Sequence, residues 1–177
     1  MKHYVIATQR EWGVKAFELI TQHDDDKQWT LACDWVSLRN AIYIYEPRFV
    51  FCLNWSSYVP PDVLAMAECV NFHCTELPFG RGGAPIENLL LRGHTETVIT
   101  AHRMTEELDA GPIYGQRGPV SLAGTKAEIL ERFIEPVVEL VRFIVDTEPE
   151  PYPQVGEIVK FSRLPVAEYE KFWRDRA

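Results

Sequence analysis

The fold is organised around the stretch Asn71-Phe-His-Cys-Thr-Glu-Leu-Pro-Phe-Gly-Arg-Gly-Gly-Ala-Pro85. It opens at the end of an apolar run, which predicts a buried strand over residues 69–73. A proline and three glycines between residues 78 and 83 then predict a loop. Asn71 and His73 stand two residues apart at the end of the strand, so both side chains point to one face. Because open α/β sheets bind ligands at the carboxyl ends of their strands, this face is a candidate site.

The chemistry of this pair depends on a third group. An amide donor and an imidazole together can stabilise an oxyanion and move a proton, although a lone Asn-x-His pair at a strand end is more often structural. Residues 108–113, Leu-Asp-Ala-Gly-Pro-Ile, are predicted to form a second loop that carries a carboxylate. An aspartate beside a histidine raises the pKa of the imidazole and fixes its tautomer. Asn71, His73 and Asp109 are therefore the candidate catalytic set.

Three motifs, in this order, resemble the signature of the folate-dependent formyltransferases. They are Asn71-x-His73, Leu77-Pro78-x-x-Arg81-Gly82 and Leu108-Asp109-x-Gly111-x-Ile113. The separation of 36 residues between His73 and Asp109 also matches this family, and the resemblance covers roughly residues 1–165. It implies that Asn71, His73 and Asp109 transfer a formyl group from 10-formyltetrahydrofolate to an amine.

The resemblance also implies a pterin pocket, held largely by backbone groups. It assigns to the folate the segment after the third strand and the loop that carries Asp109, with the contacts Asn54, Trp55, Ser57, Tyr58, Met104, Glu106 and Leu108. Taken from the residues alone, the segment over 54–61 is an ordinary connection from a strand to a helix, whose aromatic side chains cap the core.

Other reactive side chains have simpler interpretations. Cys74 adjoins His73, but neighbours in a strand point to opposite faces, which favours a structural thiol. His94 and His102 lack metal-site spacing and are interpreted as loop and strand residues. Arg81 is either a phosphate ligand or a solvated loop arginine. No metal site is expected, because the run of aspartates at 24–26 has the character of a surface turn.

The pattern along the chain predicts one α/β domain. Strands are expected over residues 3–8, 29–33, 49–53, 69–73 and 95–103, with another beginning at 112, and helices over 14–23, 37–45, 62–66, 85–92 and 125–145, the last kinked at Pro136. The resemblance implies a mostly parallel twisted sheet flanked by helices, in a Rossmann-like formyltransferase fold. Residues 1–146 are the expected catalytic domain and 147–177 a linker-like tail packed on it.

Composition narrows the environment and the partners. The chain has 18 Lys and Arg against 26 Asp and Glu, a net charge of −8, which disfavours binding to a nucleic-acid backbone. No apolar run approaches the ~20 residues needed to cross a bilayer, and the N-terminus leads directly into a strand. The four cysteines form no Cys-x-x-Cys pair, which is typical of reduced thiols. We expect a cytoplasmic protein without membrane or nucleic-acid partners; the sequence does not predict its oligomeric state.

Departures from the family pattern reduce the number of acceptor classes that the sequence favours. The turn after the first strand, residues 7–13, lacks the glycines with which the purine-pathway member binds phosphate. The separate tRNA-binding domain of the methionyl-tRNA member is not expected in a chain of 177 residues. The loop sequence resembles short members that act on nucleotide-linked amino sugars, so a small amine of that kind is the expected acceptor. The alternatives are hydrolysis of the formylated folate, a methionyl-tRNA or peptide-type formyltransferase, and a non-catalytic folate-binding module.

Overall fold

The fold is built on one six-stranded sheet. The computed structural model describes residues 1–22, 24, 26–55 and 58–176. The strands are β1 (His3–Thr8), β2 (Gln28–Ala32), β3 (Phe49–Leu53), β4 (Cys69–His73), β6 (Glu96–Arg103) and β7 (Ile113–Ser121). Their order is β2-β1-β3-β4-β6-β7; the first four run parallel, and β6 and β7 pair antiparallel. The predicted α/β class with a mostly parallel sheet is confirmed.

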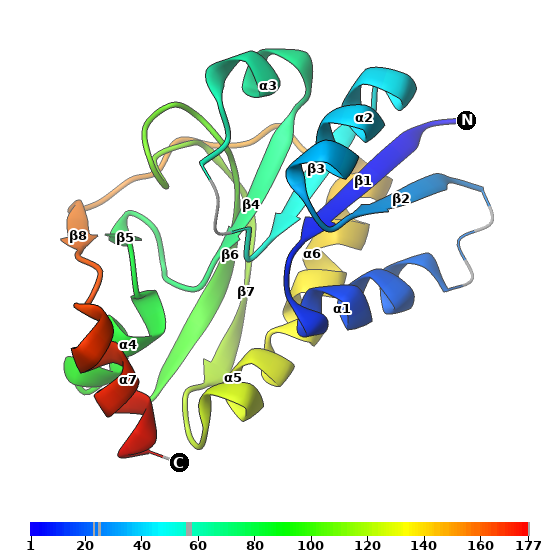
Figure 1. The fold of residues 1–177 in the computed structure, drawn as a ribbon. Helices are drawn as coiled ribbons and strands as arrows, with labels where there is room; N and C mark the ends of the chain where they lie inside the picture. Colours follow the sequence, from blue (N-terminus) through cyan, green and yellow to red (C-terminus); the bar gives the residue numbers. More distant parts are fainter. Residues whose placement is uncertain (23, 25, 56–57, 177) are drawn as a thin grey trace.

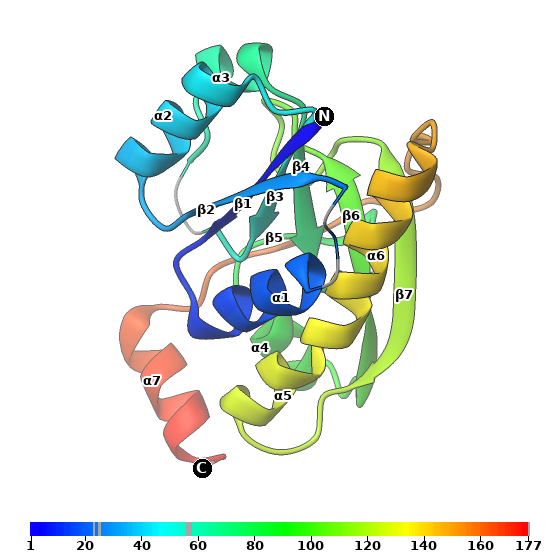
Figure 2. The same ribbon diagram turned by 90° about the vertical axis from the view of Figure 1, so that its right-hand side faces the viewer.

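Helices lie on both faces of the sheet (Figures 1 and 2). One face carries α1 (Glu11–Thr21), α5 (Lys126–Arg132) and α6 (Ile134–Thr147), and the other carries α2 (Trp35–Tyr45) and α3 (Pro61–Met66). Alternate strand residues enter the two cores: Phe51 belongs to the core that includes residues of α1 and α6, and its neighbour Val50 belongs to the core that includes residues of α2. A strand buried on both sides needs apolar residues at every position, which explains the unbroken run over 49–53. No helix in the described part of the chain is long and apolar enough to cross a membrane.

The capping of α5 was predicted correctly, but the length of this helix was not. The predicted capping box of α5 is present: Thr125 Oγ1 accepts from the backbone N–H of Glu128, whose carboxylate accepts from the N–H of Thr125. The single kinked helix over 125–145 is instead two helices, which break at Phe133. Pro136 has no N–H and its ring collides with the carbonyl four residues earlier, so it is accommodated in the first turn of a new helix.

A second, two-stranded sheet was not predicted. The glycine-rich segment interpreted as a loop contains β5 (Phe79–Gly82), which pairs in parallel with β8 (Val159–Phe161). Gly82 has φ 113°, and a Cβ there would lie 2.3 Å from the carbonyl oxygen of Phe161, so glycine is required for this close pairing. Figure 1 shows β8 and α7 (Val166–Arg174), in orange and red, beside β5 and α4 (Pro85–Leu91). The tail therefore reaches the stretch that carries the family motif.

Candidate active site

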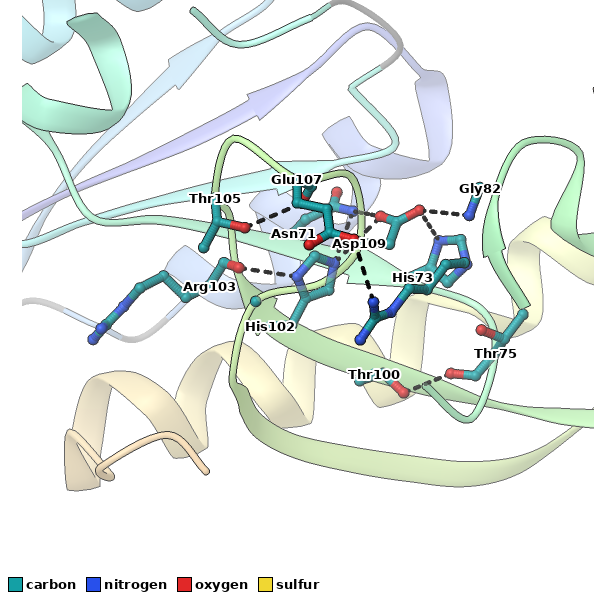
Figure 3. Close-up of polar contacts among 12 residues, drawn as sticks. Asn71, His73, Thr75, Gly82, Thr100, His102, Arg103, Thr105, Glu107 and Asp109 are labelled. Carbon is teal, nitrogen blue, oxygen red and sulfur yellow. Dashed lines mark hydrogen bonds and ion pairs between the residues drawn. The ribbon is translucent and has the colours of Figure 1, made fainter. Parts of the chain in front are cut away.

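The three candidate catalytic residues meet in one place. Asn71 and His73 lie at the end of β4, and Asp109 lies in the loop after β6. Asp109 Oδ2 is 3.7 Å from His73 Nδ1, and Asp109 Oδ1 accepts a long hydrogen bond, 3.5 Å, from Asn71 Nδ2. His73 and Asp109 are both buried, with 7% and 6% of their surface exposed. Figure 3 shows the carboxylate of Asp109 directed toward both neighbours.

Backbone geometry explains the Asp-x-Gly spacing of the loop. Asp109 has φ 53°, a left-handed conformation that aspartate and asparagine tolerate better than most residues. At Gly111 a Cβ would lie 1.8 Å from the carbonyl oxygen of Arg103, so the loop can close against the end of β6 only with glycine there. The N–H of Arg103 donates to the carbonyl of Pro112 at 2.9 Å and completes the closure. The motif thus fixes the direction of the Asp109 side chain.

Strand β5 holds the His73–Asp109 pair through its backbone. His73 Nε2 donates to the carbonyl oxygen of Gly80 at 2.7 Å, and the N–H of Gly82 donates to Asp109 Oδ2 at 2.9 Å. With its proton on Nε2, neutral His73 turns the lone pair of Nδ1 toward Asp109. A proton that enters this pair therefore lies between Nδ1 and the carboxylate.

His102 is a fourth member of the cluster that the sequence interpretation missed. Antiparallel pairing places His102 of β6 opposite Asn71 of β4, and only 2% of its surface is exposed. Its Nε2 lies 3.5 Å from Asp109 Oδ1 and 3.3 Å from Asn71 Nδ2, and its Nδ1 donates to the carbonyl of Arg103 at 3.0 Å. Asp109 thus stands between two imidazoles (Figure 3). The strand assignment of His102 was correct, but the register that brings it to Asp109 could not be derived from its position in the sequence.

The electrostatics of the pair correct one expectation. Burial lowers the pKa of His73 and outweighs the charge of Asp109 and the hydrogen bond to Gly80, which raise it. The prediction of a raised His73 pKa was therefore wrong. Burial raises the pKa of Asp109, but the neighbouring imidazoles of His102 and His73 and the N–H of Gly82 together bring it below its ordinary value. Near neutral pH the site holds a carboxylate beside a neutral His73.

The competing groups do not form a second reactive centre. Cys74 is buried, and burial raises the pKa of its thiol, which agrees with a structural role. Arg81 is only 8% exposed, because its guanidinium donates to Gln154 Oε1 at 2.8 and 3.0 Å, so it is not a solvated loop arginine. Among the described residues, no three His, Cys, Asp or Glu side chains are grouped so that they could hold a metal ion.

The residues assigned to the folate lie in two kinds of environment. The ring of Trp55 is buried, edge-on to Trp35 with centroids 5.4 Å apart, and Met104 packs against the same cluster. Ser57 lies outside the described residues. The remaining four side chains are exposed: Asn54, Tyr58, Glu106 and Leu108. Contact with folate remains a prediction for all seven.

Comparison with known proteins agrees with this architecture. The fold and site define an α/β protein in which an amide, an imidazole and a carboxylate converge at a strand end. The sequence pattern of the family described as "Formyl transferase" matches residues 36–141, more than half of the chain. The chain belongs to the formyl transferase family.

Its relatives include methionyl-tRNA formyltransferases. The Salinispora tropica protein of that name is 32% identical over 140 residues, which make up 74% of this chain and 45% of the relative. The solved structure of the Clostridium thermocellum protein has a TM-score of 0.89 at 26% identity and covers 97% of this chain and 82% of that one. The chain spans less than half the length of curated relatives that it matches, 25% of a Campylobacter fetus protein and 45% of the Salinispora one.

Two more distant structures share the fold. HypX from Aquifex aeolicus in complex with tetrahydrofolic acid has a TM-score of 0.74 at 19% identity and covers 92% of this chain and 30% of that one. A sugar N-formyltransferase from a Shewanella species has a TM-score of 0.73 at 16% identity and covers 97% and 79%.

Proposed function

We propose that this protein transfers a formyl group from 10-formyltetrahydrofolate to a primary amine. The observation that carries the proposal is the convergence of Asn71, His73 and Asp109, with Asp109 within 3.7 Å of both partners. Membership of the formyl transferase family supports the reaction type. The complex of the structurally similar HypX with tetrahydrofolic acid supports a folate as the donor.

The proposed reaction needs an oxyanion donor and a proton acceptor. The amine nitrogen attacks the formyl carbon, the carbonyl oxygen becomes an oxyanion, and the bond from carbon to N10 of the folate then breaks. Asn71 exchanges its long contacts of 3.3 and 3.5 Å for a hydrogen bond to the oxyanion. The proton lost by the amine passes to the His73–Asp109 pair, which gives it to N10 as the bond from N10 to the formyl carbon breaks. No covalent intermediate with the protein is required.

For the folate we propose the edge of the sheet beyond β3 and β4. The pterin lies between the segment that starts at Asn54 and the loop that holds Met104 and Leu108, mainly on backbone groups. A folate held there would present N10 to the end of β4.

For the acceptor we propose an amino group on a nucleotide-linked sugar. The net charge of −8 disfavours a large phosphate backbone, and the loop 73–85 resembles short members of the family. Methionyl-tRNA is the second candidate, because the relatives at 32% and 26% identity carry that name.

A mass-spectrometric screen tests both levels of the proposal. The protein is incubated with 10-formyltetrahydrofolate and a panel of amino-sugar nucleotides, or with methionyl-tRNA, and each acceptor is examined for the gain of one formyl group. A formylated sugar nucleotide without formylated tRNA is the expected result. Folate turnover without any acceptor would favour hydrolysis, and no turnover with the whole panel would contradict formyl transfer to these acceptors.

A further inference from the structure

Gln154 uses its whole amide on the surroundings of the site. It lies between α6 and β8, in the tail that was interpreted as an extended linker. Its Oε1 accepts from Arg81 Nε at 3.0 Å and from Arg81 Nη2 at 2.8 Å. Its Nε2 donates to the carbonyl oxygens of Asp109 at 2.8 Å and Gly111 at 2.9 Å. Both amide hydrogens and both lone pairs of the oxygen are therefore occupied.

These partners are the two backbone segments that hold His73 against Asp109. Arg81 stands between Gly80, which accepts from His73, and Gly82, which donates to Asp109. The other partner is the backbone of Asp109 itself. One side chain thus connects the strand that orients the imidazole to the loop that carries the carboxylate.

The backbone around Gln154 is anchored independently of its side chain. Tyr152 forms an isolated bridge with Ile113 of β7, with N–H donation in both directions at 2.7 and 2.9 Å. Loss of the Gln154 amide should therefore leave the path of the tail intact. The buried guanidinium of Arg81 would lose its two hydrogen bonds to Gln154 and keep the more distant carboxylate of Glu107, 3.7 Å from its Nη1.

We infer that Gln154 is a positioning residue of the active site, which sets the separation of His73 and Asp109 through Arg81 and the Asp109 loop. The effect on catalysis rests on the proposed function. The effect on the separation of His73 and Asp109 does not, and it can be measured without substrate. A misplacement of about 1 Å in a catalytic group costs up to roughly 100-fold in rate. Such a loss would fall on kcat rather than KM, because Gln154 contacts neither substrate in the proposed arrangement.

Two substitutions test this role. Gln154→Ala removes all four hydrogen bonds, and Gln154→Met removes them while nearly keeping the volume of the side chain and adding no charge. We expect kcat to fall roughly 10- to 100-fold in both, with KM within about twofold. Glu150→Ala, an exposed change in the same tail, is the matched control and should keep the rate of the unaltered protein.

A second measurement separates positioning from mere stability and does not depend on activity. The charged or titratable groups around His73 are Asp109, His102 and, through β5, Arg81. The His73 resonance, identified with a His73→Gln variant, is titrated by NMR in folded protein. When Asp109 is held less closely, its charge raises the His73 pKa less, so the midpoint should fall in both Gln154 variants and remain in Glu150→Ala.

The double variant with Arg81→Lys should be no slower than the slower single variant, because both changes break one connection. If the unaltered protein transfers no formyl group, the proposed function fails and the titration alone decides the inference. An unchanged His73 midpoint in folded Gln154→Met overturns the positioning role, whether or not Gln154→Ala folds. If the Gln154 variants lose both kcat and thermal stability while the His73 midpoint stays in place, the positioning role is overturned as well.

Discussion

Replacement of Asp109 by asparagine isolates the charge at the centre of the site. Asp109 has φ 53°, where asparagine is tolerated, whereas alanine would add roughly 1–2 kcal/mol of backbone strain. Asparagine also keeps an oxygen that can accept from the N–H of Gly82, now 2.9 Å from Oδ2. The variant should therefore fold normally and differ from the native protein mainly by one negative charge.

The size of the effect follows from the distance to His73. With Asp109 Oδ2 3.7 Å from His73 Nδ1 and an effective dielectric constant of about 20, the attraction to a protonated imidazole is about 4.5 kcal/mol. This corresponds to about three pKa units at 1.36 kcal/mol per unit. Burial already lowers the pKa of His73, and the variant should lower it further by up to that amount. We expect kcat near neutral pH to fall roughly 10²- to 10⁴-fold, the usual contribution of a general base.

The assay is formyl transfer at saturating folate and acceptor, together with an NMR titration of His73. Asp62→Asn, which removes an exposed carboxylate of α3 paired with Arg39, is the control and should have the native rate and the native His73 midpoint. A native rate in Asp109→Asn, or an unmoved or raised His73 midpoint, would refute the role of the carboxylate.

Three further predictions concern stability and partners. Burial lowers the pKa of His73 below 6.5, so near and below that pH the unfolded chain binds a proton that the folded chain does not. The free energy of unfolding, measured with urea, should therefore fall as the pH falls from about 7.5 to about 5.5, and it should fall less in His73→Gln. Gly82→Ala, whose Cβ would lie 2.3 Å from a carbonyl oxygen, should lower the free energy of unfolding by about 2–4 kcal/mol and reduce activity. Gly93→Ala, with no atom within 4 Å of its Cβ, should lower it by only about 1–2 kcal/mol in the same unfolding assay. In a gel shift at low salt, tRNA should show no saturable binding near ~10⁻⁶ M; saturable binding with formylation of methionyl-tRNA would restore the tRNA as acceptor.

The sequence predicted what local pattern determines. The run over 49–53 identified a buried strand, because a strand covered on both faces is apolar throughout. The pairing of β5 with β8 escaped prediction, because a glycine-rich segment has no intrinsic strand preference and gains its partner from the far end of the chain.

Local patterns also predicted part of the site, whereas its long-range contacts were missed. Asn71 and His73 were placed on one face by the period of a strand, and Asp109 entered through a motif whose glycine closes a loop. His102 reaches the carboxylate of Asp109 through antiparallel register, and Gln154 reaches the backbone carbonyl of Asp109 through a long-range contact; no spacing along the chain reveals either. The lowered pKa of His73 was missed for a related reason, since it depends on how completely the fold removes water from the ring.

The resting charge of the site suits the proposed attack by an amine. Both His73 and Asp109 have lowered pKa values, so near neutral pH the buried pair carries one negative charge and no mobile proton. As the amine attacks, its nitrogen becomes positive, and a buried carboxylate lowers the energy of that charge more than water would. The proton that leaves can enter between Nδ1 of His73 and Oδ2 of Asp109, where the imidazolium would be held by Gly80 on its other nitrogen. A pair that was already protonated could not accept it, which is why burial of His73, rather than a raised pKa, is consistent with this chemistry.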